Sequence, residues 1–226
     1  MQLQKLTNTR HNEDKRRYDD ACGLAHALDL LGERWAMLVL RELAYGPRRF
    51  SGLKGDLPGI SANVLTQRLT ELERRGLVRK AKLPPPASVQ VYEATEWGLE
   101  AIPAIASLGR WAARSPLHDP TLQMSHVSLI MSLQTLLSPE LADGLNARIG
   151  FRLGDASYVV RIHHGRLDVE RREVPDCDVI FTGPPSVVAA VIHGGAPLET
   201  IGVEGDVALA KRFITLFPLP PKVLQS

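Results

Sequence analysis

The chain has 226 residues, of which 44% are hydrophobic and 23% are charged, and its formal net charge is +2. These values are typical of a globular protein, and the length accommodates two domains of ordinary size. No apolar run approaches the roughly 20 residues that span a bilayer, and the N-terminus lacks the apolar segment of a secretory signal. Two cysteines make neither a disulfide framework nor a zinc cluster, so we expect a cytoplasmic protein with no membrane partner.

The charge is distributed unevenly along the chain. Residues 1–115 carry 18 Lys and Arg against 13 Asp and Glu, whereas residues 116–226 carry 9 against 12. Within residues 34–82 the excess is sharper, with 11 basic residues against 4 acidic ones. Such a block is typical of a phosphate-binding surface, although a solvated basic face gives the same count.

The first half of the chain predicts a winged helix-turn-helix. Residues 1–18 are polar and predict a flexible arm, and residues 19–114 predict the folded domain. In chain order we expect a helix capped by Asp19 or Asp20 and ended by Gly32, a helix over 34–46, a short helix and turn over 48–61, a helix from Ser61 to Gly76, two short strands over 77–95, and a helix that Thr95 caps. This order of helices followed by a hairpin is that of winged helix-turn-helix domains.

The second half predicts a separate α+β domain. Residues 115–123 have the proline-rich, polar character of a linker, and residues 124–226 follow it. The expected elements of this domain are a helix over 125–137, strands over 149–154, 156–165, 166–173 and 178–183, a helix over 185–195, and a last short extended piece and helix over 202–217. The whole chain is therefore predicted to be α+β, and the second domain to contain an antiparallel sheet.

The helix that begins at Ser61 has two distinct faces at about 3.6 residues per turn. Leu65, Leu69 and Leu72 form a buried stripe, which Ile60 extends. The opposite face carries small or forked polar groups that suit base edges: Asn63, Thr66, Gln67, Thr70 and Arg74. The cations expected to contact phosphates around it are Arg48, Arg49, Lys54, Arg68, Lys80 and Lys82. We predict that these residues, with Ser61, bind double-stranded DNA; the alternative is an ordinary amphipathic surface helix.

The segment from about residue 18 to 113 resembles the HxlR-type family of bacterial winged-helix regulators. The residues that carry the resemblance are Cys22, GERW at 32–35, LREL at 40–43, RRFSGL at 48–53, LPGIS at 57–61, LTQRLTELERRGLV at 65–78 and Tyr92. The resemblance implies a homodimer, formed largely through the terminal helices, that binds a two-fold operator. Apolar residues that suit the dimer seam or, equally, the domain core are Leu99, Ile102, Ile105, Leu108 and Trp111. The wing tip, PPPAS at 84–88, is poor in basic residues.

Residues 124–218 resemble the sterol carrier protein type-2-like domain. The markers are Pro175-Asp176, Asp178, Thr182 and Val203-Glu204-Gly205-Asp206. The resemblance implies an apolar tunnel for a small hydrophobic effector, whereas apolarity alone also fits a closed core. The candidate lining residues are Tyr158, Val160, Ile162, Val188, Val191, Ile192, Phe213 and Phe217.

The remaining chemistry-bearing residues indicate little else. Cys22 is expected in the first turn of a helix, whose dipole favours a thiolate, and is a candidate redox sensor, although Asp19 and Asp20 oppose ionisation. The adjacent pair His163 and His164 diverges along a strand, so we predict no metal site. We predict no catalytic residues and no cofactor, and we expect the three tryptophans in the core. Two hypotheses remain: a ligand-responsive DNA-binding regulator, and a carrier of hydrophobic ligands whose first domain serves dimerisation.

Overall fold

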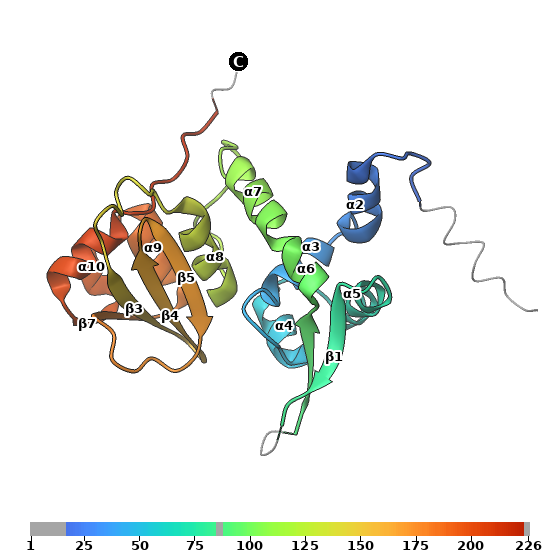
Figure 1. The fold of residues 1–226 in the computed structure, drawn as a ribbon, viewed down its shortest axis with the longest axis horizontal. Helices are drawn as coiled ribbons and strands as arrows, with labels where there is room; N and C mark the ends of the chain where they lie inside the picture. Colours follow the sequence, from blue (N-terminus) through green and yellow to red (C-terminus); the bar gives the residue numbers. More distant parts are fainter. Residues whose placement is uncertain (1–16, 85–87, 224–226) are drawn as a thin grey trace, which may run out of the picture.

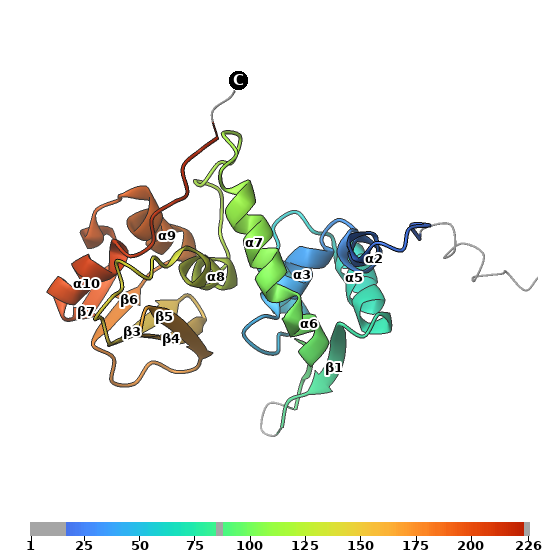
Figure 2. The same ribbon diagram turned by 45° about the horizontal axis from the view of Figure 1, so that its top comes forward.

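The computed structural model describes residues 17–84 and 88–223, which form two lobes (Figure 1). Helix α7 runs along the boundary between the lobes, and α8 lies beside it in both views (Figures 1 and 2). Most of the arm predicted for residues 1–18 and most of the predicted wing tip lie outside the described residues. None of the helices in the described ranges has the length and apolar character needed to cross a lipid bilayer.

The first lobe is a winged helix-turn-helix, as predicted. Its elements are α2 (Gly23–Leu31), α3 (Ala36–Glu42), α4 (Phe50–Asp56), α5 (Ala62–Arg74), β1 (Val78–Lys82), β2 (Gln90–Ala94), α6 (Glu96–Glu100) and α7 (Ile102–Ala112). The two strands form an antiparallel hairpin in which Val78 pairs with Ala94 and Lys82 pairs with Gln90. This hairpin is the wing.

Two helix boundaries in this lobe differ from the prediction. Helix α2 begins at Gly23, so Cys22 and not Asp19 or Asp20 is its N-cap, and the Asp20 carboxylate accepts a hydrogen bond from the Cys22 N–H. The helix predicted to follow Thr95 is divided, because α6 ends at Glu100 and α7 begins with Pro103 in its first turn. Proline is accepted there because the first turn of a helix needs no N–H donor.

Leucines from three helices fill the core of the first lobe. The predicted stripe of Leu65, Leu69 and Leu72, with Ile60, is buried against α3 and α4. Helix α6 comes so close to the residue that precedes β1 that a Cβ at Gly98 would lie 2.1 Å from the Leu77 carbonyl oxygen. Only glycine therefore fits at position 98, and this close contact sets the angle at which α6 and α7 leave the wing.

The second lobe is α+β, with three helices packed on a five-stranded sheet. Its elements are α8 (His126–Leu136), β3 (Ala147–Leu153), β4 (Ala156–His163), β5 (Arg166–Arg171), β6 (Val179–Thr182), α9 (Pro185–Gly194), the 3-10 helix η2 (Leu198–Thr200), β7 (Gly202–Gly205) and α10 (Val207–Ile214). The strand order is β5-β4-β3-β6-β7. The turn between β4 and β5 has both His164 and Gly165 at positive φ, as a tight hairpin requires.

The predicted antiparallel sheet is mixed, because β3 and β6 pair in parallel. After β5 the chain passes to the edge of β3 that does not pair with β4. There β6 begins at the same end of the sheet as β3, so the two strands run in the same direction. The crossing segment packs over Gly150, where a Cβ would lie 2.3 Å from Val174 Cγ1. It is fixed at its end by the Asp178 carboxylate, which accepts from the Arg148 N–H at 2.7 Å.

Candidate nucleic-acid interface

Helix α5 presents a polar face to solvent because its leucines are held in the core. The Ser61 hydroxyl caps the helix by accepting a hydrogen bond from the Val64 N–H at 3.2 Å, as the sequence predicts. The exposed side chains on the opposite face are the predicted ones: Asn63, Thr66, Gln67, Thr70 and Arg74. The sequence pattern and the fold therefore place the same five residues on one accessible surface.

Two of these polar groups are engaged within the helix. The Thr66 hydroxyl donates to the Ala62 carbonyl at 2.9 Å, and the Gln67 amide donates to the Glu71 carboxylate at 3.0 Å. Both contacts lie at the surface, where exchange for a base edge costs little. The Thr66 contact also leaves its methyl group free to meet a thymine methyl.

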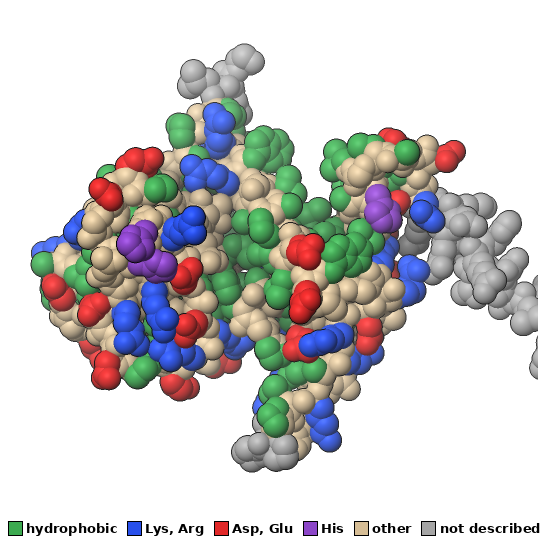
Figure 3. Space-filling view, in the orientation of Figure 1, with side chains coloured by type: hydrophobic (Ala, Val, Ile, Leu, Met, Phe, Trp, Pro, Cys, Tyr) green, Lys and Arg blue, Asp and Glu red, His purple; other side chains and the backbone are tan. Residues whose placement is uncertain are grey.

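Cations surround this face at its edges. Arg49 precedes α4, and Lys82 lies at the far end of β1; both are exposed, whereas Lys54 is half-buried. Figure 3 shows basic side chains on the hairpin above the grey tip. Lys80 is exposed but pairs with Glu73 at 2.7 Å, and this hydrogen bond raises the pKa of Lys80. Lys82 is therefore a freer phosphate contact than Lys80.

Arg68 is not a surface cation, which corrects its predicted role. Arg68 is 7% exposed. Its guanidinium lies 2.6 Å from the Glu71 carboxylate and 3.3 Å from the Glu33 carboxylate. Position 68 adjoins the leucine stripe, so the side chain turns inward to the connection between α2 and α3. Arg68 joins helices within the domain and does not reach for a phosphate.

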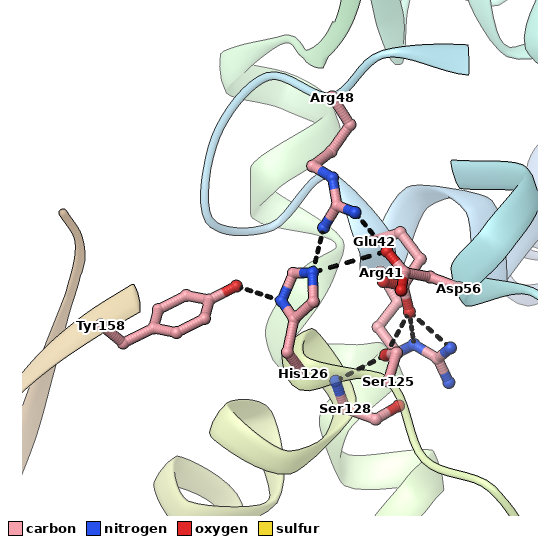
Figure 4. Close-up of polar contacts among 8 residues, drawn as sticks. All are labelled: Arg41, Glu42, Arg48, Asp56, Ser125, His126, Ser128 and Tyr158. Atoms are coloured by element: carbon pink, nitrogen blue, oxygen red, sulfur yellow. Dashed lines mark hydrogen bonds and ion pairs between the residues drawn. The ribbon is translucent and has the colours of Figure 1, made fainter. Parts of the chain in front are cut away.

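Arg48 is also buried, at 6% exposure, and also departs from its predicted role. Its Nη1 lies 2.6 Å from His126 Nε2, and its Nη2 pairs with the Asp56 carboxylate (Figure 4). His126 Nδ1 in turn lies 2.6 Å from the Tyr158 hydroxyl. The chain of contacts thus runs from the connection before α4, through the start of α8, to strand β4 of the second lobe.

The electrostatics of this chain follow from its burial. Desolvation opposes ionisation of Asp56, but its hydrogen bond with His126 and the charge of Arg48 outweigh that effect, and the pKa of Asp56 is lowered. Burial raises the pKa of Tyr158, so its hydroxyl stays protonated. The network therefore holds one guanidinium and one carboxylate together in a mostly dry interface.

A second buried contact joins the lobes beside the first. Glu42, at 1% exposure, accepts hydrogen bonds from Arg41 at 2.6 and 3.0 Å and from the Ser125 hydroxyl at 2.8 Å. Ser125 also caps α8 by accepting from the Ser128 N–H at 3.0 Å (Figure 4). Glu42, Asp56 and His126 are not among the residues that the sequence predicts for the site. The signal for Glu42 and His126 was a charged or basic residue beside an apolar helical stretch, and Asp56 had no such signal.

The eight residues predicted to line a tunnel form a packed core. All of them are at most 6% exposed, and they contact one another across the sheet, α9 and α10. Phe213 and Phe217 lie 4.9 Å apart between ring centroids, and Phe151 and Phe181 stack beside them at 5.5 Å. Two surface hollows in the described residues are lined by other side chains.

The candidate dimer residues divide into two sets. Ile102 and Ile105 are half-buried against the core of the first lobe, whereas Leu99, Leu108 and Trp111 are 41%, 49% and 72% exposed. Leu24 on α2 is exposed to 68%. The expectation that all tryptophans are core residues is wrong for Trp97 and Trp111, which face solvent on α6 and α7.

Cys22 is exposed at the N-terminus of α2. The N–H groups of Leu24 and Ala25 point at its sulfur and lower the pKa of the thiol. Cys177, by contrast, is half-buried and its pKa is raised by desolvation. Within residues 17–84 and 88–223, no group of three or more His, Cys, Asp and Glu side chains is arranged to hold a metal ion.

Comparison with known proteins identifies relatives of the first lobe. The profile of the HxlR-like helix-turn-helix family matches residues 30–118. The HTH-type transcriptional regulator YvaP of Bacillus subtilis, itself described as uncharacterized, is 35% identical over 86 residues, which are 38% of this chain and 80% of YvaP. The regulator YodB of the same organism is 35% identical over 86 residues, 38% of this chain and 77% of YodB. The solved structure of reduced YodB is 31% identical with a TM-score of 0.39, covering 44% of this chain and 100% of YodB.

Proposed function

Because this chain belongs to the HxlR-like helix-turn-helix family, whose members are transcriptional regulators and not enzymes, we propose that it binds a two-fold DNA operator as a homodimer. The observation that carries this proposal is the exposed polar face of α5. Its five polar side chains project from a helix whose leucines fix it in the domain core. Such a helix is positioned to enter a major groove and read base edges.

The exposed cations near α5 supply the part of the DNA affinity that depends little on base sequence. Arg49 ahead of α4 and Lys82 on the wing are both exposed. Contacts of this kind to phosphates fix the register of a protein on the duplex, while the helix face selects the sequence.

Exposed apolar side chains on two helices support the homodimer. Leu24 and Leu28 on α2, and Leu108 and Trp111 on α7, are large hydrophobic residues that face solvent in the single chain. Of the nine residues of α2, only Ala25 is buried. A two-fold operator requires the partner that covers these faces to hold the two recognition helices about one helical turn of DNA (~34 Å) apart.

For the second lobe we propose a sterol-carrier-like effector domain in a cytoplasmic regulator. The Arg48–His126 contact supports this role, since a change in the position of α8 acts through His126 on Arg48, just before α4. An effector alters operator affinity only if it binds the DNA-competent and DNA-incompetent arrangements with different affinities. A ligand among the eight core residues has to separate α9 and α10 from the sheet, because these side chains are packed together.

DNA selection with the purified full chain tests the first proposal. Genomic fragments that the protein retains are sequenced, and fluorescence anisotropy then compares an enriched duplex with a scrambled one at several salt concentrations. We expect enrichment of a two-fold sequence and a steep loss of affinity with added salt. Failure to enrich any duplex, together with free exchange of a hydrophobic ligand, contradicts DNA binding and favours a carrier.

Substitutions on α5 test the reading face. The double variant Asn63→Ala/Gln67→Ala is expected to lose tenfold or more of its affinity for the enriched duplex, since each bidentate base contact is worth about 1–3 kcal/mol. The matched control is Gln123→Ala/Asn146→Ala, which removes the same two groups from exposed positions in the second half of the chain. If both double variants keep the wild-type sequence preference, another face reads the DNA.

A further inference from the structure

A hollow of about 340 Å³ lies between α7 and α8, on the boundary of the two lobes. Its residues come in two groups, one from each helix: Ile102, Pro103, Ala106, Ser107 and Arg110 from α7, and Met131, Gln134 and Thr135 from α8. The volume is within the range of small-molecule sites, roughly 300–1,000 Å³, and domain boundaries are places where such sites occur. None of the eight residues that the sequence predicts to line a tunnel in the second lobe lines this hollow.

The hollow is apolar at one end and basic at the other. Ile102, Pro103, Ala106 and Met131 supply an apolar wall, and Arg110 is its only charged side chain. The Arg110 guanidinium donates one hydrogen bond, to the Thr135 carbonyl at 2.8 Å. No carboxylate of the described residues lies within ion-pair distance of it. Four of its five N–H donors therefore remain for an anionic group.

One lining residue connects the hollow to the helix-turn-helix. The Gln134 side chain accepts a hydrogen bond from the Tyr45 hydroxyl at 2.5 Å and donates to the Leu167 carbonyl at 3.3 Å. Tyr45 lies three residues before Arg48, and its ring packs edge-on against Tyr158 at 5.9 Å between centroids. An occupant that moves Gln134 thus acts on the segment that leads into α4.

We propose that this hollow is the effector site, and that its ligand is a small amphipathic monocarboxylate. The apolar body of the ligand packs on Ile102, Ala106 and Met131, and its carboxylate pairs with Arg110. This inference rests on the proposed function for its regulatory meaning, but the binding itself is independent of DNA. The exposed Leu108 lies on a different face of α7 from the lining residues, whereas Trp111 stands one turn after the lining residue Ser107, so a dimer partner seated on Leu108 and the ligand occupy separate surfaces.

Methionine methyl NMR of the full chain, without DNA, tests the proposal. The chain has four methionines, and Met131 lies in the hollow whereas Met37 and Met124 do not line it. The probe is 4-phenylbutyrate, and its neutral counterpart is 4-phenylbutyramide. We expect the carboxylate to shift the Met131 signal in a saturable way and the amide to bind at least tenfold more weakly.

Two variants and one control define the site. Arg110→Gln is expected to remove the preference for the carboxylate over the amide, and Ala106→Phe to fill the hollow and abolish both shifts. Arg114→Gln is the control, since this arginine follows α7 and contacts the Pro221 carbonyl outside the hollow. Equal binding of amide and carboxylate by the wild type, or no Met131 shift at millimolar probe, overturns the proposal.

A Met131 signal that moves with protein concentration alone also overturns it, because a second copy of the chain then fills the hollow. Loss of DNA selection with an intact Met131 titration contradicts the proposed function and leaves the site standing. Intact DNA selection without a Met131 titration contradicts the proposed site and leaves the proposed function standing.

Discussion

The Arg48 guanidinium and the His126 imidazole meet at 2.6 Å across the boundary of the two lobes. Arg48 lies in the α3–α4 connection, and His126 is the first residue of α8, 78 residues later. The pairing with Asp56 and the contact to Tyr158 complete a buried polar path from the helix-turn-helix to the sheet. A residue whose sequence context predicts a phosphate contact thus fixes the second lobe to the DNA-binding unit.

Replacing Arg48 by methionine is expected to lower the free energy of unfolding by about 3 kcal/mol. The physical reason is that Asp56 and His126 then stay in the interface without their cation, and breaking a buried pair from one side is costly. Asp56 retains 22% of its side-chain exposure, which keeps the loss near the lower end of the usual range. Urea unfolding monitored by circular dichroism measures the change.

The neighbouring Arg49→Met variant is the matched control. Arg49 is exposed, so its loss should change the unfolding free energy by less than about 0.5 kcal/mol while weakening DNA binding. Equal destabilisation by both substitutions contradicts the structural role assigned to Arg48.

Local patterns in the sequence were sufficient to predict which face of α5 is exposed. The spacing of Leu65, Leu69 and Leu72 determines which side of α5 is buried, and Ser61 determines where the helix begins. Both signals lie within one element, where periodicity and capping act over a few residues. The prediction of the five exposed polar side chains follows directly.

Contacts between distant segments could not be predicted in the same way. The burial of Arg48 depends on His126, and the exposure of Leu108 rather than Ile105 depends on how α7 crosses α3. Alternating residues predicted the strands of the second lobe but not their order, because the position of β6 beside β3 is decided by the crossing segment over Gly150. In each case the deciding partner is remote in sequence.

Removing the Lys82 cation is expected to reduce the salt dependence of DNA binding. Lys82 is exposed on the wing and has one phosphate to neutralise, so Lys82→Ala should lower the slope of log affinity against log salt by about 1. Fluorescence anisotropy on the enriched duplex at four salt concentrations gives the slope. The control is Lys211→Ala on α10 in the other lobe, which should leave the slope unchanged. A wild-type slope in the Lys82 variant would remove the wing from the interface.

Charge placed on the exposed face of α7 is expected to dissociate the homodimer. Leu108 is 49% exposed in the single chain, and in the proposed homodimer its burial against the partner would make a carboxylate there unfavourable. Size-exclusion chromatography with light scattering should therefore show a dimer for the wild type and a monomer for Leu108→Glu at the same concentration. Leu219→Glu, at a position of 45% exposure near the C-terminus, should stay dimeric. A dimeric Leu108 variant would move the interface to another surface.

Alkylation of the two cysteines is expected to follow different pH profiles. The thiolate is the reacting species, and the N–H groups of Leu24 and Ala25 lower the pKa of Cys22 while desolvation raises that of Cys177. A lower pKa means a larger thiolate fraction at any pH below it, so the rate at Cys22 should reach half its maximum at the lower pH. Iodoacetamide labelling with peptide mass spectrometry at a series of pH values from about 2.5 units below to about 1.5 units above the ordinary thiol pKa of ~8.5 resolves the two sites.

The pH of half-maximal rate separates ionisation from accessibility. Exposure of Cys22 raises its absolute rate at every pH but does not move the midpoint, so coincident midpoints contradict activation by the N-terminus of α2. Cys22→Ser should remove the low-pH phase, and Cys177→Ser should keep it. Oxidant sensing by Cys22 requires one further result. Diamide treatment should abolish operator binding by the wild type but not by Cys22→Ser. A normal diamide response in that variant would exclude Cys22 as the sensor and leave the α7–α8 hollow as the candidate point of control.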